Sequence, residues 1–544
     1  MTTRTNRQRE MKACTPCAKL KIKCELRRTD DKCKRCIRLG KQCERQAPGA
    51  HSSKGTPVHE SATADVLQLR AASNPISQSL RTVAPTFRVS LAPMIQPSQS
   101  PLSESGGLWP NEQDAIDMLR LFQLEMSYLF PFVVVPWHVT PSELRDAEPL
   151  LYTAIMMAAS QSNRSRQLRL AQVFREEVSR AVLVDGEKRL GIVQAILVYI
   201  AWNHVHVKIG HQVIVQLHLA IAQITELELD RNPRQPSRVA VGAFRALEKD
   251  ASEVSPRTLD ERRAFLGALW VASIIKACLK DIQGLEFTAY VQECCTVLEE
   301  AQDTPNDFYL VQLIRSQSLV DRVSKILYAD EKLPIMTPAL SMTISILEKE
   351  IQKQEVSAWL NSRCTPFLKL QHNMLKLHLY KIVLDDYLFQ PQSSHALLRS
   401  NLLISCFHTV ETLLQCFISL PSLTVLCLPF TNWAMVGHGM FVLSRAIDVQ
   451  HGNYGTTALS GALSLRELYH SAGEKLDEVM AAGSKELPPR SLPEPFEQMA
   501  VKLKEMGQVP QRNTLNPERL WESTVNGNEM NFTSFDWGYE MWGV

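Results

Sequence analysis

Six cysteines near the amino terminus are the residues of this sequence whose type and spacing could do chemistry. They form two C-x2-C-x6-C runs, the second 19 residues after the first, and they are Cys14, Cys17, Cys24, Cys33, Cys36 and Cys43. The segment around them has few apolar residues from which a core could form. A region this small folds only when disulfides or metal ions hold it together.

The number of thiol groups determines how many metal ions they can hold. A tetrahedral zinc site needs four ligands, so six thiolates serve one Zn2+ with two sulfurs left over, or two Zn2+ ions if two sulfurs bridge. The repeat allows three bridging pairs, namely Cys14/Cys33, Cys17/Cys36 and Cys24/Cys43. A disulfide knot is the alternative, but the polar and basic residues Met1 to Arg9 contain no secretory signal. The sequence therefore favours zinc over disulfides.

Positive charge is concentrated in the same segment. Residues 1–45 hold 15 Lys/Arg against 5 Asp/Glu, a balance of +10, whereas the remainder holds 44 against 52, a balance of −8. Two Zn2+ ions and six thiolates together contribute −2, so about +8 would face outward. A compact positive region on a negatively charged body is typical of a module that binds a polyanion.

The cysteine spacing and the basic residues between the cysteines resemble the fungal six-cysteine binuclear zinc cluster, a DNA-binding module of transcription regulators. The resemblance implies two Zn2+ ions, with Cys14 and Cys33 each binding both. One ion would take Cys14, Cys17, Cys24 and Cys33, and the other would take Cys14, Cys33, Cys36 and Cys43. It also implies double-stranded DNA as the partner, CGG-like triplets as the target and the nucleus as the location.

The basic residues around the cysteines divide into one expected base contact and several expected phosphate contacts. The run from Ala18 to Lys23 alternates lysines with apolar residues and predicts one or two helical turns held at both ends by metal. In the major groove a lysine can donate to the O6/N7 edge of guanine, and the resemblance assigns that role to Lys21. Phosphate contacts position a module without reading sequence. They are expected from Lys19, Lys23, Lys34, Arg35, Arg38 and Lys41.

Composition divides the chain into five regions. Residues 1–13 form a basic amino terminus expected to be disordered, 14–45 the zinc cluster, and 46–110 a flexible linker rich in Ser, Pro, Thr, Ala and Gln. Residues 111–485 are expected to be all-helical, and 486–544 to be a disordered acidic and aromatic tail. Prolines and glycines after the cluster interrupt any heptad pattern, so no dimerising coiled coil is predicted there and a homodimer is left open.

The fold class predicted for the chain is mainly α. From about Glu112 to Gly483 apolar residues recur at helical spacing, and no alternating strand pattern of convincing length occurs. Segments such as Val198–Trp202 and Asp260–Ala264 resemble the regulatory helical domain that follows the zinc cluster in many such fungal factors. The cysteines of this region are expected to be core thiols. They are Cys278, Cys294, Cys295, Cys364, Cys406, Cys416 and Cys427.

Three other features of this region have ordinary structural interpretations. Two apolar stretches could suggest a membrane span, but Ile192–Trp202 is too short and Leu423–Leu443 is interrupted at Pro429, so buried helices and no membrane are expected. Trp202 and Trp433 are expected to be core anchors. The histidines His204, His206, His211 and His218 are expected to lie in the core or on the surface without binding metal.

The last residues of the sequence interleave aromatic and acidic side chains. Between Asn531 and Trp542 there are five aromatic and two acidic residues, and no basic residue follows Arg519. This pattern is typical of a disordered activation segment, in which acid keeps the aromatics solvated until the groove of a transcriptional coactivator buries them. The alternative is a tail that docks on its own helical domain.

Two functions remain after the sequence is searched for catalytic motifs. No H-E-x-x-H, Walker loop, G-x-S-x-G or dinucleotide-binding G-x-G-x-x-G occurs in a suitable setting, so an enzyme is not expected. The leading interpretation is a zinc-dependent, sequence-specific regulator of RNA polymerase II genes that activates a metabolic or biosynthetic pathway. The alternative is a zinc-stabilised protein-interaction scaffold or co-regulator that does not read DNA sequence.

Replacement of Lys21 tests the assigned base contact. Lys21→Ala is expected to weaken specific DNA binding by about 1–3 kcal/mol and to relax base preference at one position of the site. The measurement is the affinity of the parent protein and of the Lys21→Ala variant for a set of single-base variants of the target DNA. Equal weakening on every sequence would assign Lys21 to the phosphates instead.

Overall fold

The computed structural model describes three residues of the cysteine-rich segment and most of the remaining chain. The described residues are Cys33, Cys36 and Cys43, then 107–202, 212–233, 256–279, 282–328, 336–357, 363–386, 388–389, 395–453 and 459–507. The chain divides into two compact units, Met1–Leu102 and Ser103–Val544. The described part of the second unit consists of helices and their connections, without a strand. The mainly α fold class is therefore confirmed.

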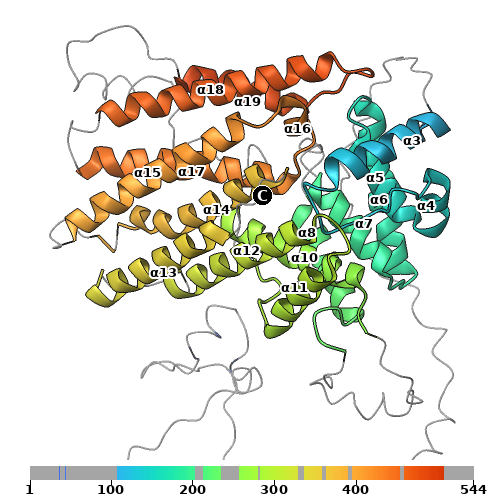
Figure 1. The fold of residues 1–544 in the computed structure, drawn as a ribbon, viewed down its shortest axis with the longest axis horizontal. Helices are drawn as coiled ribbons and strands as arrows, with labels where there is room; N and C mark the ends of the chain where they lie inside the picture. Colours follow the sequence, from blue (N-terminus) through green and yellow to red (C-terminus); the bar gives the residue numbers. More distant parts are fainter. Residues whose placement is uncertain are drawn as a thin grey trace, which may run out of the picture. The chain divides into compact units, whose positions relative to one another are not determined.

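The first half of the helical unit packs around α5 (Pro149–Ala159) and α7 (Leu190–Ala201), which lie against each other (Figure 1). In α5 and α7 nearly all side chains are buried, and a helix that is apolar all round must lie inside a protein. The stretch Ile192–Trp202 is thus a core helix, as expected. The elements are α3 (Glu112–Leu121), the π-helical turn η1 (Phe122–Met126), α4 (Pro141–Ala147), α5 (Pro149–Ala159), α6 (Arg164–Ser179), the π-helical turn η2 (Arg180–Val184), α7 (Leu190–Ala201) and α8 (Val213–Glu226).

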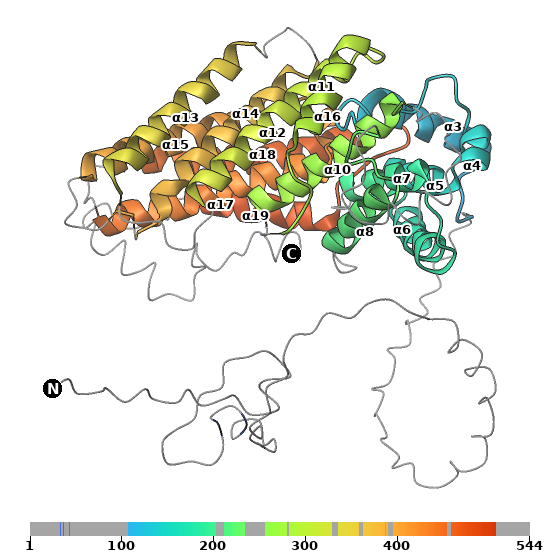
Figure 2. The ribbon, with the colours of Figure 1, turned by 90° about the horizontal axis from the view of Figure 1, so that it is seen from below.

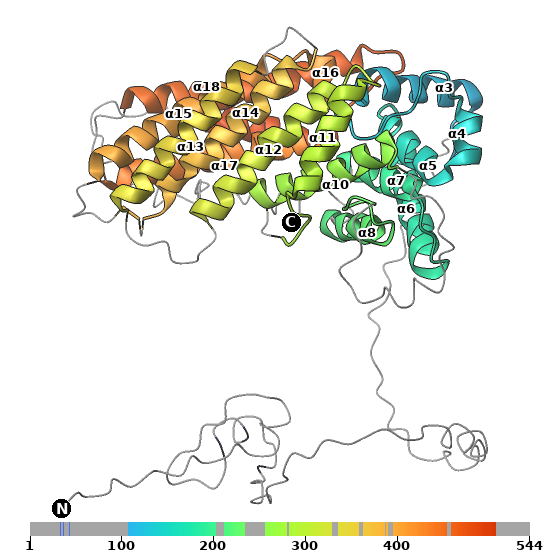
Figure 3. The same cartoon turned by 60° about the horizontal axis from the view of Figure 1, so that its bottom comes forward.

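The second half consists of longer helices that run alongside one another (Figures 2 and 3). Helix α14 packs against α12, α13 and α15, and α15 packs in turn against α17 and α18. The elements are α10 (Leu259–Cys278), α11 (Ala289–Ala301), α12 (Asp307–Leu327), α13 (Pro338–Ser357), α14 (Thr365–Tyr380), the 3-10 turn η4 (Lys381–Leu384), α15 (Ala396–Ile418), α16 (Ser422–Leu426), α17 (Phe430–Asn453), α18 (Leu459–Ser484) and α19 (Glu494–Gly507).

Trp202 joins the two halves. Its ring packs edge-on against Phe122 and Phe130, and its indole N–H donates to the carbonyl of Cys427 at 3.1 Å. Gln161 makes a parallel link, donating to the carbonyl of Leu426 at 3.1 Å. Trp202 is 1% exposed, and so is Trp433. Both tryptophans are core anchors, as the sequence predicts.

A buried arginine ties α10 to α12. Arg263 donates from Nε and Nη2 to both carboxylate oxygens of Asp307 at 2.9 Å, and it also contacts Asp260 and Asp303 at 2.8 Å. Arg263 and Asp307 are each 1% exposed. Burial alone would lower the pKa of this guanidinium, but the hydrogen bonds to the carboxylates outweigh it and raise the pKa. Arg263 is therefore held in its charged form.

The carboxyl end of α10 is buried, and two side chains satisfy its carbonyl groups. Lys381 donates to the carbonyl of Ala277 at 3.4 Å, and His438 Nδ1 lies 3.0 Å from the carbonyl of Cys278. Only an N–H can donate to a carbonyl, so the His438 ring carries a proton on Nδ1. Burial and the nearby charge of Lys381 lower the pKa of His438 to about 3, so the ring is neutral.

Two apolar stretches are candidates for a membrane-spanning helix by their length and composition. Leu423–Leu443 is divided between α16 and α17, with Pro429 at the break, as expected. Among the described helices, α15 is long and apolar enough to cross a membrane by length and composition, a feature that sequence reasoning missed. Its buried face, with Val410, Leu413 and Leu414, packs against α14 and α17. A helix buried in a protein core also meets these criteria of length and composition.

The expected boundary of the tail is wrong. Residues 486–544 were expected to be disordered, yet Glu494–Gly507 forms α19, which packs along α18. Phe496, Met499 and Leu503 are buried at helical spacing, and the Phe496 ring packs edge-on against Trp433 with centroids 4.6 Å apart. The helical unit therefore extends to Gly507. Residues 508–544 lie outside the described part of the chain, as do 1–13 and 46–106.

Gly473 allows α18 and α19 to approach closely. A Cβ at this position would lie 2.8 Å from the backbone carbonyl oxygen of Ala500 and 3.1 Å from the backbone nitrogen of Lys504. Gly473→Val is expected to lower the free energy of unfolding by about 1–3 kcal/mol, because the backbone cannot move aside without separating the helices. Thermal and denaturant unfolding measure this. Ala481→Val, at an exposed position of α18, is the control and should cost only a few tenths.

Candidate metal centre

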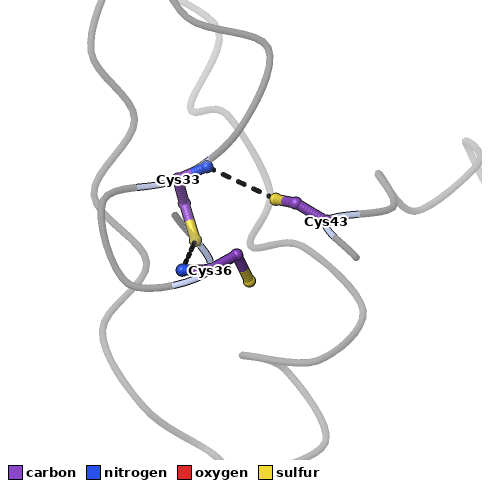
Figure 4. A group of neighbouring side chains, drawn as sticks. All are labelled: Cys33, Cys36 and Cys43. Atoms are coloured by element: carbon purple, nitrogen blue, oxygen red, sulfur yellow. Dashed lines mark hydrogen bonds between the residues drawn. The ribbon is translucent and has the colours of Figure 1, made fainter. Parts of the chain in front are cut away.

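Three thiol groups converge in the amino-terminal unit (Figure 4). The sulfur atoms of Cys33, Cys36 and Cys43 all lie within 4.8 Å of one another. Cys33 is fully buried, Cys36 is 4% exposed and Cys43 is half-buried. The sulfurs come from residues three and ten positions apart in the chain, so the second C-x2-C-x6-C run places its own three cysteines around one point.

Backbone amides support the sulfurs electrostatically. The N–H of Cys36 donates to the sulfur of Cys33 at 3.4 Å, and the N–H of Cys33 donates to the sulfur of Cys43 at 3.3 Å. Hydrogen bonds to the charged form of a group favour ionisation. These amides therefore stabilise the thiolates, which are the form of cysteine that binds metal.

The spacing of the sulfurs fits a tetrahedral metal ion. With zinc–sulfur bonds of about 2.3 Å, neighbouring sulfurs of a tetrahedron lie about 3.8 Å apart. Sulfurs within 4.8 Å of one another reach that separation with a small movement. None of the three is in a disulfide. Three corners of one tetrahedral site are thus present, and a fourth ligand would complete it.

These three cysteines are those that the resemblance assigns, together with Cys14, to one of the two ions. The structure brings Cys33, Cys36 and Cys43 together. The other predicted ligands, Cys14, Cys17 and Cys24, lie outside the described residues, and so do the predicted DNA contacts Lys19, Lys21, Lys23, Lys34, Arg35, Arg38 and Lys41. The bridging role of Cys33, the second ion and the DNA contacts remain predictions.

The cysteines of the helical unit have a different environment. All seven are outside disulfides, and five are buried. Burial raises the pKa of Cys406 to about 12 and that of Cys427 to about 11, so both are neutral thiols at ordinary pH. Among the described residues, the only group of three or more potential ligands close enough to hold a metal ion is Cys33, Cys36 and Cys43.

One residue of the predicted histidine cluster, His218, is described by the structure. His218 is exposed and lies on α8, with its Nδ1 2.8 Å from the carbonyl of Ile214. His204, His206 and His211 lie outside the described residues. The described part of the cluster is therefore a surface histidine, as the sequence predicts.

Comparisons with known proteins point to one functional class. The chain is 27% identical over 461 residues to transcription factor himD of Aspergillus japonicus, covering 82% of this chain and 74% of that protein. It is 27% identical over 461 residues to transcription factor opdL of Penicillium oxalicum, covering 80% and 77%. Transcription factor pbcR of Emericella nidulans is 24% identical over 64% of this chain and 52% of its own length. No family model matches the chain, and no solved structure matches it.

Replacement of Cys33 tests the bridging arrangement. Cys33→Ser is expected to remove both metal ions, because a sulfur that binds two ions leaves both one ligand short. Metal analysis of the purified full chain measures this. Cys416→Ser, in the helical unit, is the control and should retain the metal content of the parent chain. A Cys33→Ser chain that keeps one full equivalent of zinc would show that Cys33 does not bridge.

Proposed function

Because this chain is a relative of fungal transcription factors and carries the six-cysteine sequence at its amino terminus, we propose that it is a zinc-dependent, sequence-specific DNA-binding regulator of RNA polymerase II genes. The observation that carries the proposal is the convergence of Cys33, Cys36 and Cys43. It supports a metal-held fold in the one segment of the chain with a strong positive charge. The proposal places the protein in the nucleus.

In this proposal two Zn2+ ions bind Cys14, Cys17, Cys24, Cys33, Cys36 and Cys43. Zinc supplies the folding energy that the segment cannot obtain from an apolar core. The chain's own residues then do the recognition. Lys21 donates to base edges of a CGG-like triplet, and the remaining lysines and arginines of the segment bind phosphates and set the register of the module on the duplex.

The rest of the chain has the parts that an activator needs. The helical unit from α3 to α19 is a large compact unit with an extensive apolar core, and this supports a regulatory role. The acidic aromatic segment Asn531–Trp542 would bind a coactivator by burying its aromatic side chains in an apolar groove. The proposal assigns activation of metabolic or biosynthetic genes to these parts, and no catalytic step to the chain.

The competing function is that of a scaffold whose zinc-stabilised amino-terminal segment, residues 1–45, binds a protein. The charge of this segment favours DNA as its binding partner, because Lys/Arg exceed Asp/Glu by 10 in residues 1–45. The two functions differ in their response to salt. Binding through phosphate contacts falls log-linearly as the salt concentration rises, whereas an interface built on apolar burial does not respond in this way.

Selection of DNA by the full chain tests the proposal. Duplex oligonucleotides bound from a random pool are expected to be enriched in a CGG-like triplet, single or paired. The affinity for the selected site should fall log-linearly between 50 and 200 mM salt, by about tenfold or more for several phosphate contacts. The Cys33→Ser chain is the control and should enrich nothing. If the zinc-loaded chain enriches no sequence, the scaffold function replaces the regulator.

A further inference from the structure

Helix α13 lies at the edge of the helical unit, and no described element covers its outer face (Figures 1 and 2). Its inner face, with Ile344, Leu347 and Ile351, is buried against α14 and α12. The opposite face carries a line of exposed side chains at helical spacing. The residues of this outer stripe of α13 are Ala339, Met342, Ile346, Lys349 and Lys353.

The first half of the outer stripe is apolar. Met342 is 68% exposed and Ile346 is 53% exposed, and the two lie one helical turn apart. Adjacent exposed apolar side chains, unlike single ones, can mark an interaction surface. Covering them would remove apolar area from water, which favours binding of an apolar partner.

The second half of the outer stripe is positively charged. Lys349 and Lys353 are exposed, and neither has an ion-pair partner among the described residues. The acidic residues next to them are engaged on neighbouring helices. Glu348 accepts a hydrogen bond from the hydroxyl of Tyr380 at 2.6 Å, and Glu350 pairs with Arg322 of α12. The outer stripe therefore suits an occupant that carries both apolar and acidic side chains.

The chain itself contains a segment of that chemistry. Helix α19 ends at Gly507, and 37 residues follow, from Gln508 to Val544. After Arg519 these contain four acidic and no basic residues. Two other long segments outside the described residues, 46–106 and 234–255, each contain several basic residues. Charge therefore favours the carboxyl-terminal segment as the occupant.

The aromatic residues of this segment recur at helical spacing. Phe532, Phe535, Tyr539 and Trp542 would share one face of a helix. Asp536 and Glu540, four residues apart, would lie along one edge of that face. Gly538 disfavours a helix in isolation, so we expect the helix to form when the segment binds. The pattern is that of an amphipathic helix that lays its apolar face on a partner.

We propose that the outer stripe of α13 binds the segment Asn531–Trp542 of the same chain. Aromatic side chains of the segment cover the apolar half of the stripe, and its two carboxylates pair with the two lysines. The spacing matches, because the members of each charged pair are four residues apart, about 6 Å along a helix axis. The 23 residues from Gln508 to Met530 span up to about 80 Å when extended, enough to cross a helical domain.

Tethering makes a contact of this size effective. Surface ion pairs contribute little on their own, so burial of the aromatic side chains supplies most of the affinity. A connection within one chain gives the segment an effective concentration near the millimolar range, so even a weak site is substantially filled. While bound, the aromatic side chains are unavailable to a coactivator. This restraint of activation rests on the proposed function, whereas the contact itself needs neither DNA nor zinc.

Zero-length carbodiimide cross-linking of the full chain tests the contact. Asp536 or Glu540 is expected to form amide cross-links to Lys349 or Lys353 within one molecule, at a yield independent of protein concentration. Peptide mapping by mass spectrometry identifies the linked pairs. Cross-links between molecules that increase with concentration would show docking on a second copy and would overturn the proposal. Carboxylates of the segment that link only to other lysines, or to none, would overturn it as well.

Charge reversal gives an independent measurement. The variant Lys349→Glu/Lys353→Glu is expected to make cleavage by chymotrypsin within residues 531–542 several-fold faster, because the aromatic side chains are released. Adding Asp536→Lys/Glu540→Lys should restore the parental rate, because the charges of both partners are then reversed. Faster cleavage that this second change does not correct would refute the pairing of these charges.

The control for net charge is Arg169→Glu/Lys485→Glu, which replaces two exposed cationic side chains outside α13. It changes the charge of the protein by the same amount and should cleave at the parental rate. Equal acceleration in this control and in Lys349→Glu/Lys353→Glu would assign the effect to net charge and overturn the proposal.

The same assay tests the apolar half of the outer stripe. Met342→Gln/Ile346→Gln should also accelerate cleavage several-fold, because the aromatic side chains lose the apolar surface on which they are buried. Both positions are exposed and glutamine favours a helix, so the fold is retained. Leu397→Gln/Ile404→Gln, at two exposed apolar positions of α15, is the matched control and should cleave at the parental rate. Parental cleavage of the α13 variant would refute the contact, whether or not the protein binds DNA.

Discussion

The main constraint on the amino-terminal unit is the electrostatic repulsion that arises when the three sulfur atoms lying close together are ionised. Two thiolates 4.8 Å apart repel each other by about 3–4 kcal/mol at an effective dielectric constant near 20, and three do so pairwise. Backbone N–H groups offset part of this repulsion at Cys33 and Cys43. A divalent cation at the centre would turn this repulsion into net attraction, since each thiolate would attract the ion. Such a cation would make the convergence of the three sulfurs favourable.

The helical unit obtains its stability in a different way. Its interior is apolar, and several of the polar groups that enter it pair across helices, as Arg263 does with Asp307 and as the end of α10 does with Lys381 and His438. Its cysteines are protonated because burial disfavours their charged form. The same side chain is thus a candidate metal ligand in one unit and a core residue in the other.

Local patterns in the sequence predicted much of the fold, and long-range partners could not be predicted. The spacing of Cys33, Cys36 and Cys43 indicated a shared site because it is short. The break at Pro429 was visible because proline cannot continue a helix. Helix α19 was missed because four prolines between Pro488 and Pro495 suggested a tail, although Pro495 lies in the first turn, where proline is tolerated. The Arg263–Asp307 pair spans 44 residues, and neither residue indicates its partner in the sequence.

The metal content of the full chain, purified without added metal, tests the central claim most directly. The account predicts two zinc ions per chain. It also predicts that a strong chelator removes them and abolishes sequence-specific DNA binding, which returns when zinc is restored. A chain that carries no zinc, or that still recognises its DNA sequence after complete chelation, would contradict the account.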